Sequence, residues 1–348
     1  MKPRKKTKRV RTRDWTEAHE FAFSHDRARH SRGEKLPDAV LERGFEATTT
    51  APNAVVVSHT GQWAFVRKDG AELCCLIDEK LVEGAATLLA PGDRVLVERE
   101  GADWRVRGIA ERRTKLSRLA LERSRVSEQI IAVNIDLLVV VASVARPRFK
   151  RGVVDRYLIA AEVGGANALL CVNKMDLVDA EPKEVGPYRE LGLTMLNTSC
   201  VTGEGIESLR TALRGKLSVF AGQSGVGKSS LLNVLAPELG IETKEVSEAT
   251  EKGRHTTTTA RLYEIGGDIR IIDTAGARQL GVWGVTPAEL AFYFPEMGRH
   301  AAACRFRNCT HVHEPGCAVQ AAVEAEEIKR ARYQSYLRIR ESLKEDSF

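Results

Sequence analysis

Apolar and polar positions alternate with a short period in the N-terminal part of the chain. From about Phe45 to Ile109, short β-rich runs are separated by the turns Lys68-Asp69-Gly70, Pro91-Gly92-Asp93 and Glu100-Gly101-Ala102-Asp103. The runs are 54–57, 63–66, 73–77, 94–97 and 104–109. About five strands in this length predict a small all-β barrel. An OB-fold fits this pattern, and any other small barrel fits it equally well.

The pattern changes from Ile130 onward, where apolar strands alternate with amphipathic helices. Residues 135–144 and 168–172 have the pattern of buried strands, and residues 155–163 lie between them as a helix. This alternation predicts an α/β sheet that is mostly parallel. Residues 261–265 and 269–273 flank Gly266-Gly267-Asp268, which predicts a β-hairpin and therefore one antiparallel edge strand.

Two further segments have simpler patterns. The charged stretch from Glu111 to Arg125 is typical of a linker or a solvated basic helix, and the C-terminal part of the chain is helical in pattern. Together with the barrel and the α/β sheet, these segments predict a multidomain protein.

Composition agrees with a folded protein of two or three domains. The 348 residues are 43% hydrophobic and 29% charged, which excludes general disorder. The longest apolar run, from Ile135 to Ala145, contains Asp136 and is shorter than the roughly 20 residues that a membrane-spanning helix requires. No apolar segment follows the basic N-terminus, so we expect a cytoplasmic protein without a secretory signal or membrane association.

The net charge of +6 hides an asymmetry between the N-terminus and the remainder. The first thirteen residues contain eight cations and no acid, so the rest of the chain carries a net charge of −2. Such a run cannot bury apolar surface, which predicts a flexible arm suited to the phosphates of a nucleic acid. The alternative is a tail that only promotes solubility.

Residues 222–229 match the phosphate-loop pattern G-x-x-x-x-G-K-[ST]. The preceding residues 216–221 can form a strand and the following residues 230–235 a helix, which is the order this motif needs for backbone N–H groups to surround phosphates. Lys228 would neutralise the β- and γ-phosphates, and Ser229 would bind Mg²⁺. The expected phosphate-binding residues are Gly222, Gln223, Ser224, Gly225, Val226, Gly227, Lys228, Ser229 and Ser230. The alternative, a glycine-rich turn with no ligand, is disfavoured by these flanks.

A second phosphate-site element follows the apolar strand of residues 269–272. Asp273-Thr-Ala-Gly276 has the D-x-x-G spacing, in which the aspartate contacts the water shell of Mg²⁺ and Gly276 offers its N–H to the γ-phosphate. The spacing alone occurs often by chance, and only its place after the phosphate loop and a hairpin gives it weight.

Residues 173–176, Asn173-Lys174-Met175-Asp176, point to guanine as the base. A carboxylate at Asp176 can accept hydrogen bonds from N1 and N2 of guanine, which adenine does not present. The loop with Thr198, Ser199 and Cys200 would support the base from its other side. Asn173 lies 49 positions before Gly222, whereas ordinary GTPases have the phosphate loop first. The order therefore predicts a circularly permuted GTPase domain.

The polar segment from Glu251 to Thr259 has the composition of a switch loop. One threonine there should reach Mg²⁺, and Thr257 and Thr258 are equal candidates. Many GTPases place a glutamine directly after D-x-x-G to orient the attacking water, but this chain has Ala277, so intrinsic hydrolysis should be slow. His255 is the candidate that would replace the glutamine, because a neutral imidazole can hold water. The alternative for this segment is an ordinary surface loop.

Three of the seven cysteines lie in one short window that also contains two histidines. Cys304, Cys309 and Cys317 with one imidazole, from His311 or His313, would complete a tetrahedral Zn²⁺ site with no open position. Such a site is structural rather than catalytic.

Taken together, these motifs resemble the RsgA (YjeQ) family of GTPases that depend on the small ribosomal subunit. The shared features are the barrel, the order NKMD, GQSGVGKSS, GRHTTT and D-T-x-G, and the spacing C-x4-C-x-H-x5-C. The resemblance implies that His311 is the fourth zinc ligand and that the barrel is an OB-fold contacting ribosomal RNA. It implies that the zinc segment makes a second contact and that the small subunit activates GTP hydrolysis in late assembly. It also implies a monomer. Ala275 departs from the proline that is common in this family.

The sequence thus predicts five parts. They are a basic arm (1–40), an OB-fold RNA-binding domain (41–112), a basic linker (113–128), a circularly permuted GTPase domain (129–283) and a C-terminal helical zinc-binding domain (284–348). Two other classes of function remain open at this stage. One is a P-loop ATPase or kinase, and the other is a ribosome-binding scaffold whose nucleotide site does not turn over.

Overall fold

The computed structural model describes residues 47–82, 89–122, 125–240, 260–274 and 283–345. These residues belong to two compact units, one within Phe45–Val285 and one within Thr286–Phe348.

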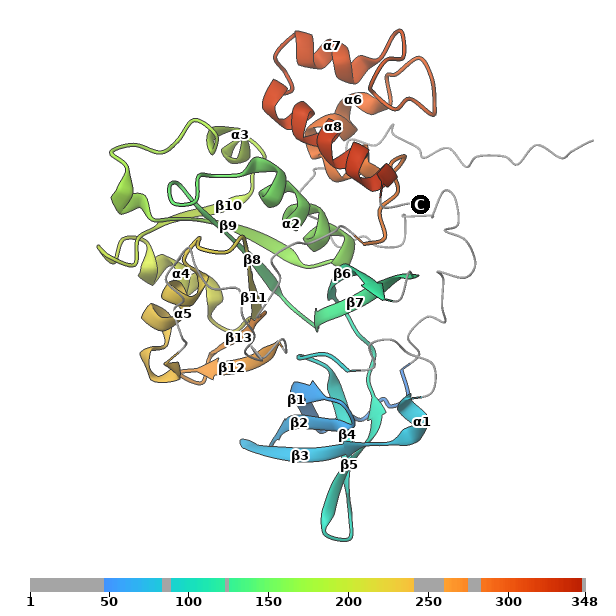
Figure 1. The fold of residues 1–348 in the computed structure, drawn as a ribbon, viewed down its shortest axis with the longest axis vertical. Helices are drawn as coiled ribbons and strands as arrows, with labels where there is room; N and C mark the ends of the chain where they lie inside the picture. Colours follow the sequence, from blue (N-terminus) through green and yellow to red (C-terminus); the bar gives the residue numbers. More distant parts are fainter. Residues whose placement is uncertain (1–46, 83–88, 123–124, 241–259, 275–282, 346–348) are drawn as a thin grey trace, which may run out of the picture. The chain divides into compact units, whose positions relative to one another are not determined.

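The N-terminal strands form a closed barrel with the order β1-β2-β3-β5-β4. They are β1 (Ala54–Thr60), β2 (Trp63–Lys68), β3 (Ala71–Ile77), β4 (Arg94–Glu100) and β5 (Asp103–Ile109), with the short helix α1 (Glu79–Val82) after β3. Alternate residues such as Val56, Val66 and Val106 fill the interior and are fully buried. The barrel strands are drawn in blue to cyan in Figure 1. All five expected strands are confirmed, and their closure as an OB-fold barrel decides between the alternatives that the sequence left open.

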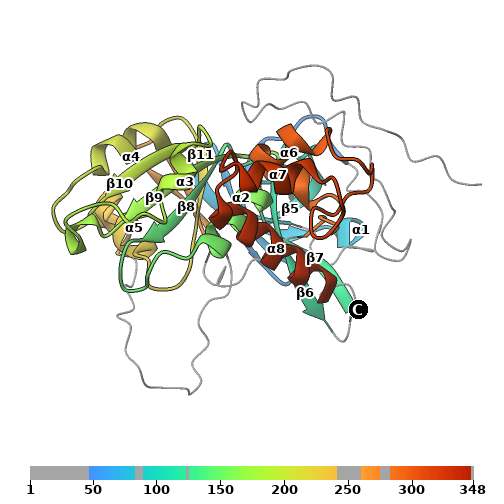
Figure 2. The ribbon, with the colours of Figure 1, turned by 90° about the horizontal axis from the view of Figure 1, so that it is seen from above.

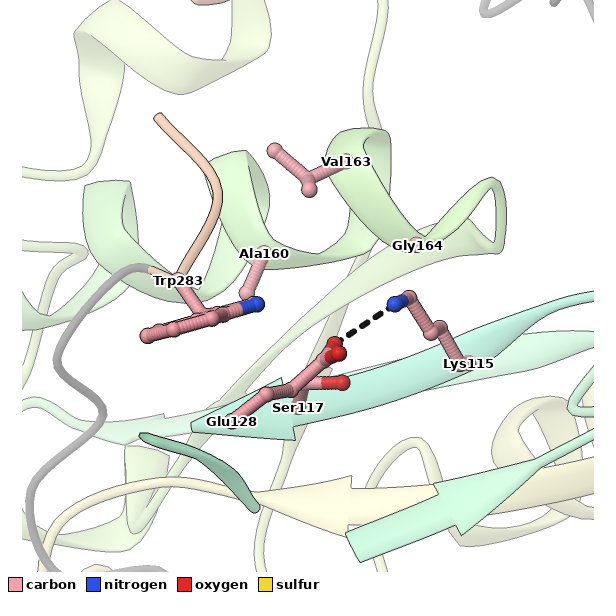
Figure 3. Close-up of a pocket in the computed structure, with 7 residues that line it drawn as sticks. All are labelled: Lys115, Ser117, Glu128, Ala160, Val163, Gly164 and Trp283. Atoms are coloured by element: carbon pink, nitrogen blue, oxygen red, sulfur yellow. Dashed lines mark ion pairs between the residues drawn. The ribbon is translucent and has the colours of Figure 1, made fainter. Parts of the chain in front are cut away.

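The charged stretch after the barrel is neither a linker nor a helix. Strands β6 (Lys115–Glu122) and β7 (Arg125–Val133) pair antiparallel as a separate two-stranded sheet. Leu116 is fully buried, and Lys115 pairs with Glu128 across the hairpin at 2.6 Å. Figure 3 shows this ion pair beside Trp283 and residues of α2 (Arg151–Gly164). The expectation was wrong because the charged residues masked the pattern of a strand whose pairing partner, β7, begins only at the last residue of the charged stretch.

The second part of the larger unit is a six-stranded sheet with the order β10-β9-β8-β11-β13-β12. Its strands are β8 (Leu137–Ser143), β9 (Asn167–Asn173), β10 (Thr194–Thr198), β11 (Leu217–Ala221), β12 (Arg261–Ile265) and β13 (Ile269–Asp273). Only the pair β12–β13 is antiparallel, and β12 is an edge strand, as the hairpin pattern predicted.

Helices cover this sheet on both faces, as Figure 2 shows from above. Leu137, Val139 and Val141 of β8 pack with α4 (Ile206–Leu213) and α5 (Lys228–Leu235) in one core, while α2 packs against β8 from outside this core. Because β8 is buried on both faces, its sequence is a continuous apolar run rather than an alternation. The short elements η2 (Met175–Leu177), α3 (Gly186–Arg189) and η3 (Pro237–Leu239) lie in the connections.

The barrel is joined to the sheet through the turn at Gly92. Asn134 donates from Nδ2 to the Gly92 carbonyl at 2.9 Å, and Arg112 makes two hydrogen bonds of 2.7 Å to the carboxylate of Asp93. The side chains of Arg112 and Asp93 are 7% and 0% exposed, so this ion pair is buried.

The C-terminal unit is helical. It contains η4 (Leu290–Tyr293), α6 (Pro295–Ala301), α7 (Ala318–Glu324) and α8 (Arg330–Glu345). Phe294 and Tyr336 meet edge to face in its core, with ring centroids 5.7 Å apart. Arg332 lies over the Phe294 ring and donates to Glu296 at 2.7 Å. None of the helices in the described ranges has the length and apolar character needed to cross a bilayer.

Candidate nucleotide site and metal centre

The phosphate loop begins where β11 ends and leads directly into α5. Two glycines determine its path. A Cβ on Gly222 would lie 2.2 Å from the Val141 carbonyl oxygen, and a Cβ on Gly227 would lie 2.3 Å from Nδ2 of Asn173. Gly227 also has φ 97, in the region that side chains disfavour, and it is the N-cap of α5. Only glycine therefore allows the loop to lie this close to β8 and β9.

Lys228 and Asp273 lie at the same edge of the sheet. The Lys228 ammonium group donates to the carbonyl oxygens of Gly222 at 2.7 Å and Gln223 at 3.0 Å. Burial raises the pKa of Asp273, while the positive charge of Lys228 acts in the opposite direction. The parallel register of β11 and β13 places Phe220 opposite Asp273, which brings this carboxylate beside the phosphate loop. With the hydroxyl of Ser229 in the first turn of α5, these oxygen atoms are the kind of ligand that Mg²⁺ prefers.

Asn173 connects the base-recognition loop to the phosphate loop. It is the last residue of β9, is buried, and donates from Nδ2 to the Val226 carbonyl oxygen at 3.0 Å. Its Oδ1 accepts a hydrogen bond of 3.1 Å from the Thr198 hydroxyl. Asn173 therefore holds both the phosphate loop and the loop of Ser199 and Cys200, which begins at the end of β10.

Lys174 makes a second connection between the same loops. Its Nζ donates to the Gly225 carbonyl oxygen at 2.7 Å and to the Arg146 carbonyl oxygen at 2.5 Å. Burial lowers the pKa of Lys174, and the charge of Asp176 opposes this shift. These two hydrogen bonds fix the ammonium end of the Lys174 side chain, and the Lys174 backbone has φ 65.

Asp176 is exposed and is oriented by Ser199. The Ser199 hydroxyl donates to Oδ1 of Asp176 at 2.5 Å and accepts from the backbone N–H of Val201 at 3.1 Å and Thr202 at 3.2 Å. Met175 and Cys200 beside them are half-buried. Burial, followed by the negative charge of Asp176, raises the pKa of the Cys200 thiol.

The structure thus brings together most of the residues that the sequence assigned to one nucleotide site. The motif at residues 173–176 and the phosphate loop share direct hydrogen bonds although 49 positions separate their first residues. The expected catalytic residues His255 and Thr257, the alternative Thr258, and Gly276 and Ala277 lie outside the described residues. Their roles, and those of the other site residues toward a nucleotide, stay predictions.

Three thiols and an imidazole converge in the C-terminal unit. The ligand atoms of Cys304, Cys309, His311 and Cys317 all lie within 4.8 Å of one another. His311 Nδ1 is 3.5 Å from Cys304 Sγ and 3.4 Å from Cys317 Sγ, and the two sulfurs are 3.9 Å apart. A tetrahedral Zn²⁺ with ordinary bond lengths needs about 3.6 Å between nitrogen and sulfur and about 3.8 Å between sulfurs. The donor set and its spacing therefore fit zinc.

Hydrogen bonds from the surroundings orient two of these four residues, His311 and Cys317. His311 is 4% exposed, has φ 59, and its carbonyl accepts a hydrogen bond of 2.6 Å from the Tyr333 hydroxyl. Cys317 caps α7 through its sulfur, which accepts from the Gln320 N–H. Of the two candidate histidines, His311 lies in the cluster and His313 does not.

Sequence reasoning missed two residues that shape these sites, Arg146 and Glu314. Arg146 contributes a backbone carbonyl. Thr198, which the sequence placed in the loop that supports the base, also braces Asn173. Glu314 receives hydrogen bonds from the N–H groups of Thr310 at 3.0 Å and Val312 at 3.1 Å, which closes the loop between the metal ligands. Burial acts to raise the pKa of Glu314, but hydrogen bonds from the Thr310 hydroxyl and from the backbone N–H groups of Thr310, Glu314 and His313 outweigh burial and lower the pKa. The position of Glu314 between ligands was a usable signal, whereas a backbone carbonyl leaves none in a sequence.

The fold and the site define the class of this protein. In this sheet, a guanine-recognition motif at the end of β9 precedes a phosphate loop at the end of β11. This order defines a circularly permuted P-loop GTPase domain. The chain belongs to the RsgA GTPase family, whose model matches residues 109–283. It is therefore a GTP-hydrolysing enzyme, and the resemblance seen in the sequence is confirmed.

Similar proteins cover most of the chain. The small ribosomal subunit biogenesis GTPase RsgA of Gemmatimonas aurantiaca is 39% identical over 303 residues, which are 85% of this chain and 98% of that protein. The protein of the same name from Chlorobaculum tepidum is 42% identical over 271 residues, covering 75% of this chain and 87% of its own length.

Two solved structures are similar in fold. The crystal structure of YjeQ from Thermotoga maritima has a TM-score of 0.66 at 31% identity and covers 84% of this chain and 98% of its own. The crystal structure of YloQ, described as a circularly permuted GTPase, has a TM-score of 0.62 at 26% identity and covers 85% of this chain and 96% of its own.

Proposed function

We propose that this chain hydrolyses GTP to GDP and phosphate when it is bound to the small ribosomal subunit, in late assembly of that subunit. The observation that carries the proposal is the direct hydrogen bonding between the base-recognition loop (residues 173–176, below called the base loop) and the phosphate loop, through Asn173 and Lys174. These contacts form a site with a carboxylate at one end, at Asp176, and an ammonium group at the other, at Lys228. The names of the relatives supply the partner, because those proteins are called small ribosomal subunit biogenesis GTPases.

Within this site, Lys228 binds the β- and γ-phosphates, and Ser229 and Asp273 hold Mg²⁺, directly or through its water. Lys228 then exchanges the carbonyl oxygens of Gly222 and Gln223 for phosphate oxygens. Mg²⁺ supplies charge neutralisation for the phosphates when it is bound. Thr257 or Thr258 completes the set of magnesium ligands. His255 orients the attacking water, because this chain has Ala277 where many GTPases have a glutamine for that role.

The other parts of the chain bind the partner. The barrel and the zinc-binding unit contact ribosomal RNA, and the basic arm adds phosphate contacts. Zn²⁺ on Cys304, Cys309, His311 and Cys317 stabilises the fold of the C-terminal unit and takes no part in the reaction. The chain acts as a monomer in the cytoplasm.

Phosphate release from GTP, with and without purified small subunits, tests the function. We expect slow release by the protein alone and a large increase when subunits are added. Competition by adenine nucleotides distinguishes a GTPase from a P-loop ATPase or kinase, because ATP would displace GTP from an ATPase or kinase. Turnover unchanged by subunits would instead indicate a scaffold.

The role of His255 needs its own variant. His255→Ala should abolish most of the subunit-stimulated rate while GDP affinity stays the same, and His313→Ala is the matched control because His313 lies outside the metal cluster. Full stimulated hydrolysis by His255→Ala would remove this residue from the mechanism.

Metal content tests the zinc assignment. The purified chain should contain about one zinc per molecule. Cys309→Ser should lose it, whereas Cys74→Ser, which changes an exposed thiol of the barrel, should retain it. Equal zinc content in both variants would exclude the site.

A further inference from the structure

The connection from β8 to α2 carries a cluster of exposed cations. It leaves β8 at the carboxyl edge of the sheet, between β9 and β11, where the base loop and the phosphate loop begin. Arg146, Arg148 and Lys150 are exposed, and the residues between them, Pro147 and Phe149, are half-buried. The loop therefore turns its basic side chains outward and its apolar ones inward. We call residues 146–150 the basic loop.

The backbone of the basic loop is held at three points. The Ser143 hydroxyl donates to the Pro147 carbonyl oxygen at 2.7 Å, and Lys174 Nζ donates to the Arg146 carbonyl oxygen at 2.5 Å. Phe149 packs edge to face on the buried Tyr188, with ring centroids 5.7 Å apart. The cations thus extend from a backbone of defined shape, which reduces the ordering that binding would otherwise require.

The charge of this loop is not neutralised by the fold. Within the described ranges, none of its three cations has a carboxylate within the 4.0 Å of an ion pair. Some other exposed arginines of the same domain do have one. Arg189 lies 2.5 Å from Glu181, and Arg214 lies 3.7 Å from Asp268. The basic loop is therefore a concentrated positive patch at the edge of the nucleotide site, and no fold contact explains its charge.

We propose that Arg146, Arg148 and Lys150 form a contact surface for the phosphate backbone of RNA, next to the nucleotide site. This inference rests on the proposed function, because it assigns one surface to the RNA partner. RNA fits better than an acidic protein, since a protein interface needs an apolar centre and the residues between these cations are turned inward. Backbone phosphates need only Arg and Lys side chains on a defined scaffold.

The position of this surface connects it to the reaction. Lys174 donates to the carbonyl oxygens of both Arg146 and Gly225, so a single side chain connects the basic loop, where the RNA would bind, to the phosphate loop. RNA held on the basic loop would stabilise this arrangement of Lys174, and binding of the subunit and of the nucleotide would favour each other.

The double variant R148Q/K150Q tests the proposal, with K216Q/R270Q as its control. Both variants remove two exposed cations, but Lys216 and Arg270 lie at the opposite, amino-terminal edge of the sheet, where the Arg270 N–H bonds the Lys216 carbonyl at 3.3 Å. Affinity for small subunits is measured at several salt concentrations with a non-hydrolysable GTP analogue, together with basal hydrolysis and GDP affinity.

We expect R148Q/K150Q to weaken subunit binding by at least about threefold and to make the log–log salt dependence shallower by roughly 1.4 to 1.8, because each phosphate contact contributes about 0.7 to 0.9. Basal hydrolysis and GDP affinity should stay unchanged, and the control variant should behave like the wild type in every measurement.

Four results would overturn the inference. Subunit binding by R148Q/K150Q with the wild-type affinity and salt slope would remove the surface. An equal loss in the control would reduce the effect to net charge. A loss of GDP affinity would assign the cations to the nucleotide instead. A loss seen with whole subunits but not with protein-free ribosomal RNA would assign them to a ribosomal protein. If the wild type itself bound no subunits, the proposed function would fail as well, which distinguishes the two failures.

Discussion

Gly227 offers the sharpest test of how the base loop and the phosphate loop are fitted together. Replacing it by alanine places a Cβ 2.3 Å from Nδ2 of Asn173, at a backbone φ of 97. The φ value costs roughly 1–2 kcal/mol for a residue with a side chain. The contact forces Asn173 away from the Val226 carbonyl, and a buried carbonyl without its partner costs about 1–3 kcal/mol.

The sum, about 2–5 kcal/mol, must be overcome each time the loop adopts its binding geometry. Gly227→Ala should therefore bind GDP and GTP at least about 30-fold more weakly, since 1.4 kcal/mol corresponds to a factor of ten. Titration with a fluorescent guanine nucleotide measures this loss. Gly70→Ala is the control for backbone strain alone, because Gly70 has φ 81 but no atom within 4 Å of the added Cβ.

A double variant separates the clash from other effects. Asn173→Ala removes the atom that the new Cβ meets, so the combined loss in N173A/G227A should be smaller than the sum of the single losses. Nucleotide affinity of Gly227→Ala within threefold of the wild type, or strictly additive losses, would refute the fitted contact between these loops.

Other properties follow from single contacts. Asp176→Asn should lower GTP affinity by at least about tenfold and favour xanthine nucleotides, which exchange a donor for an acceptor at the base edge, and nucleotide competition measures this. Arg112→Ala should lower the free energy of unfolding in urea by about 3–5 kcal/mol, because it leaves the carboxylate of Asp93, 0% exposed, without its partner. Burial lowers the pKa of His59 below 6.5, although the charge of Asp93 acts to raise it. As the pH falls, His59 is therefore protonated at a higher pH in the unfolded state than in the folded state. The resulting stability is present above about pH 6.5 and is lost as the pH falls, and His59→Gln should flatten that slope in urea unfolding. A chelator should lower the melting temperature of the C-terminal unit while leaving that of the larger unit unchanged, as a calorimetric scan with two transitions would show.

The sequence by itself determined the class of chemistry and most of the elements. The five barrel strands, the hairpin at the sheet edge, the permuted order of the motifs and the Cys/His cluster were all readable because each depends on local spacing or on chain order. A phosphate loop needs its glycines and lysine in one short segment, and the order of two motifs is a property of the chain alone. The switch residues His255 and Thr257 stay predictions at this level, since they lie outside the described residues.

Only the tertiary structure decided how distant segments meet. The charged stretch after the barrel became a β-hairpin because β7 and α2 provide it with partners, which no local count of charges could show. Asn173 serves the phosphate loop through Val226, 53 positions later, and Lys174 reaches the Arg146 carbonyl. His311 rather than His313 joins the cysteines because the fold brings its Nδ1 within 3.5 Å of two sulfurs. Such contacts depend on the parallel register of neighbouring strands and on loop geometry, and neither is written in the spacing of residues along the chain.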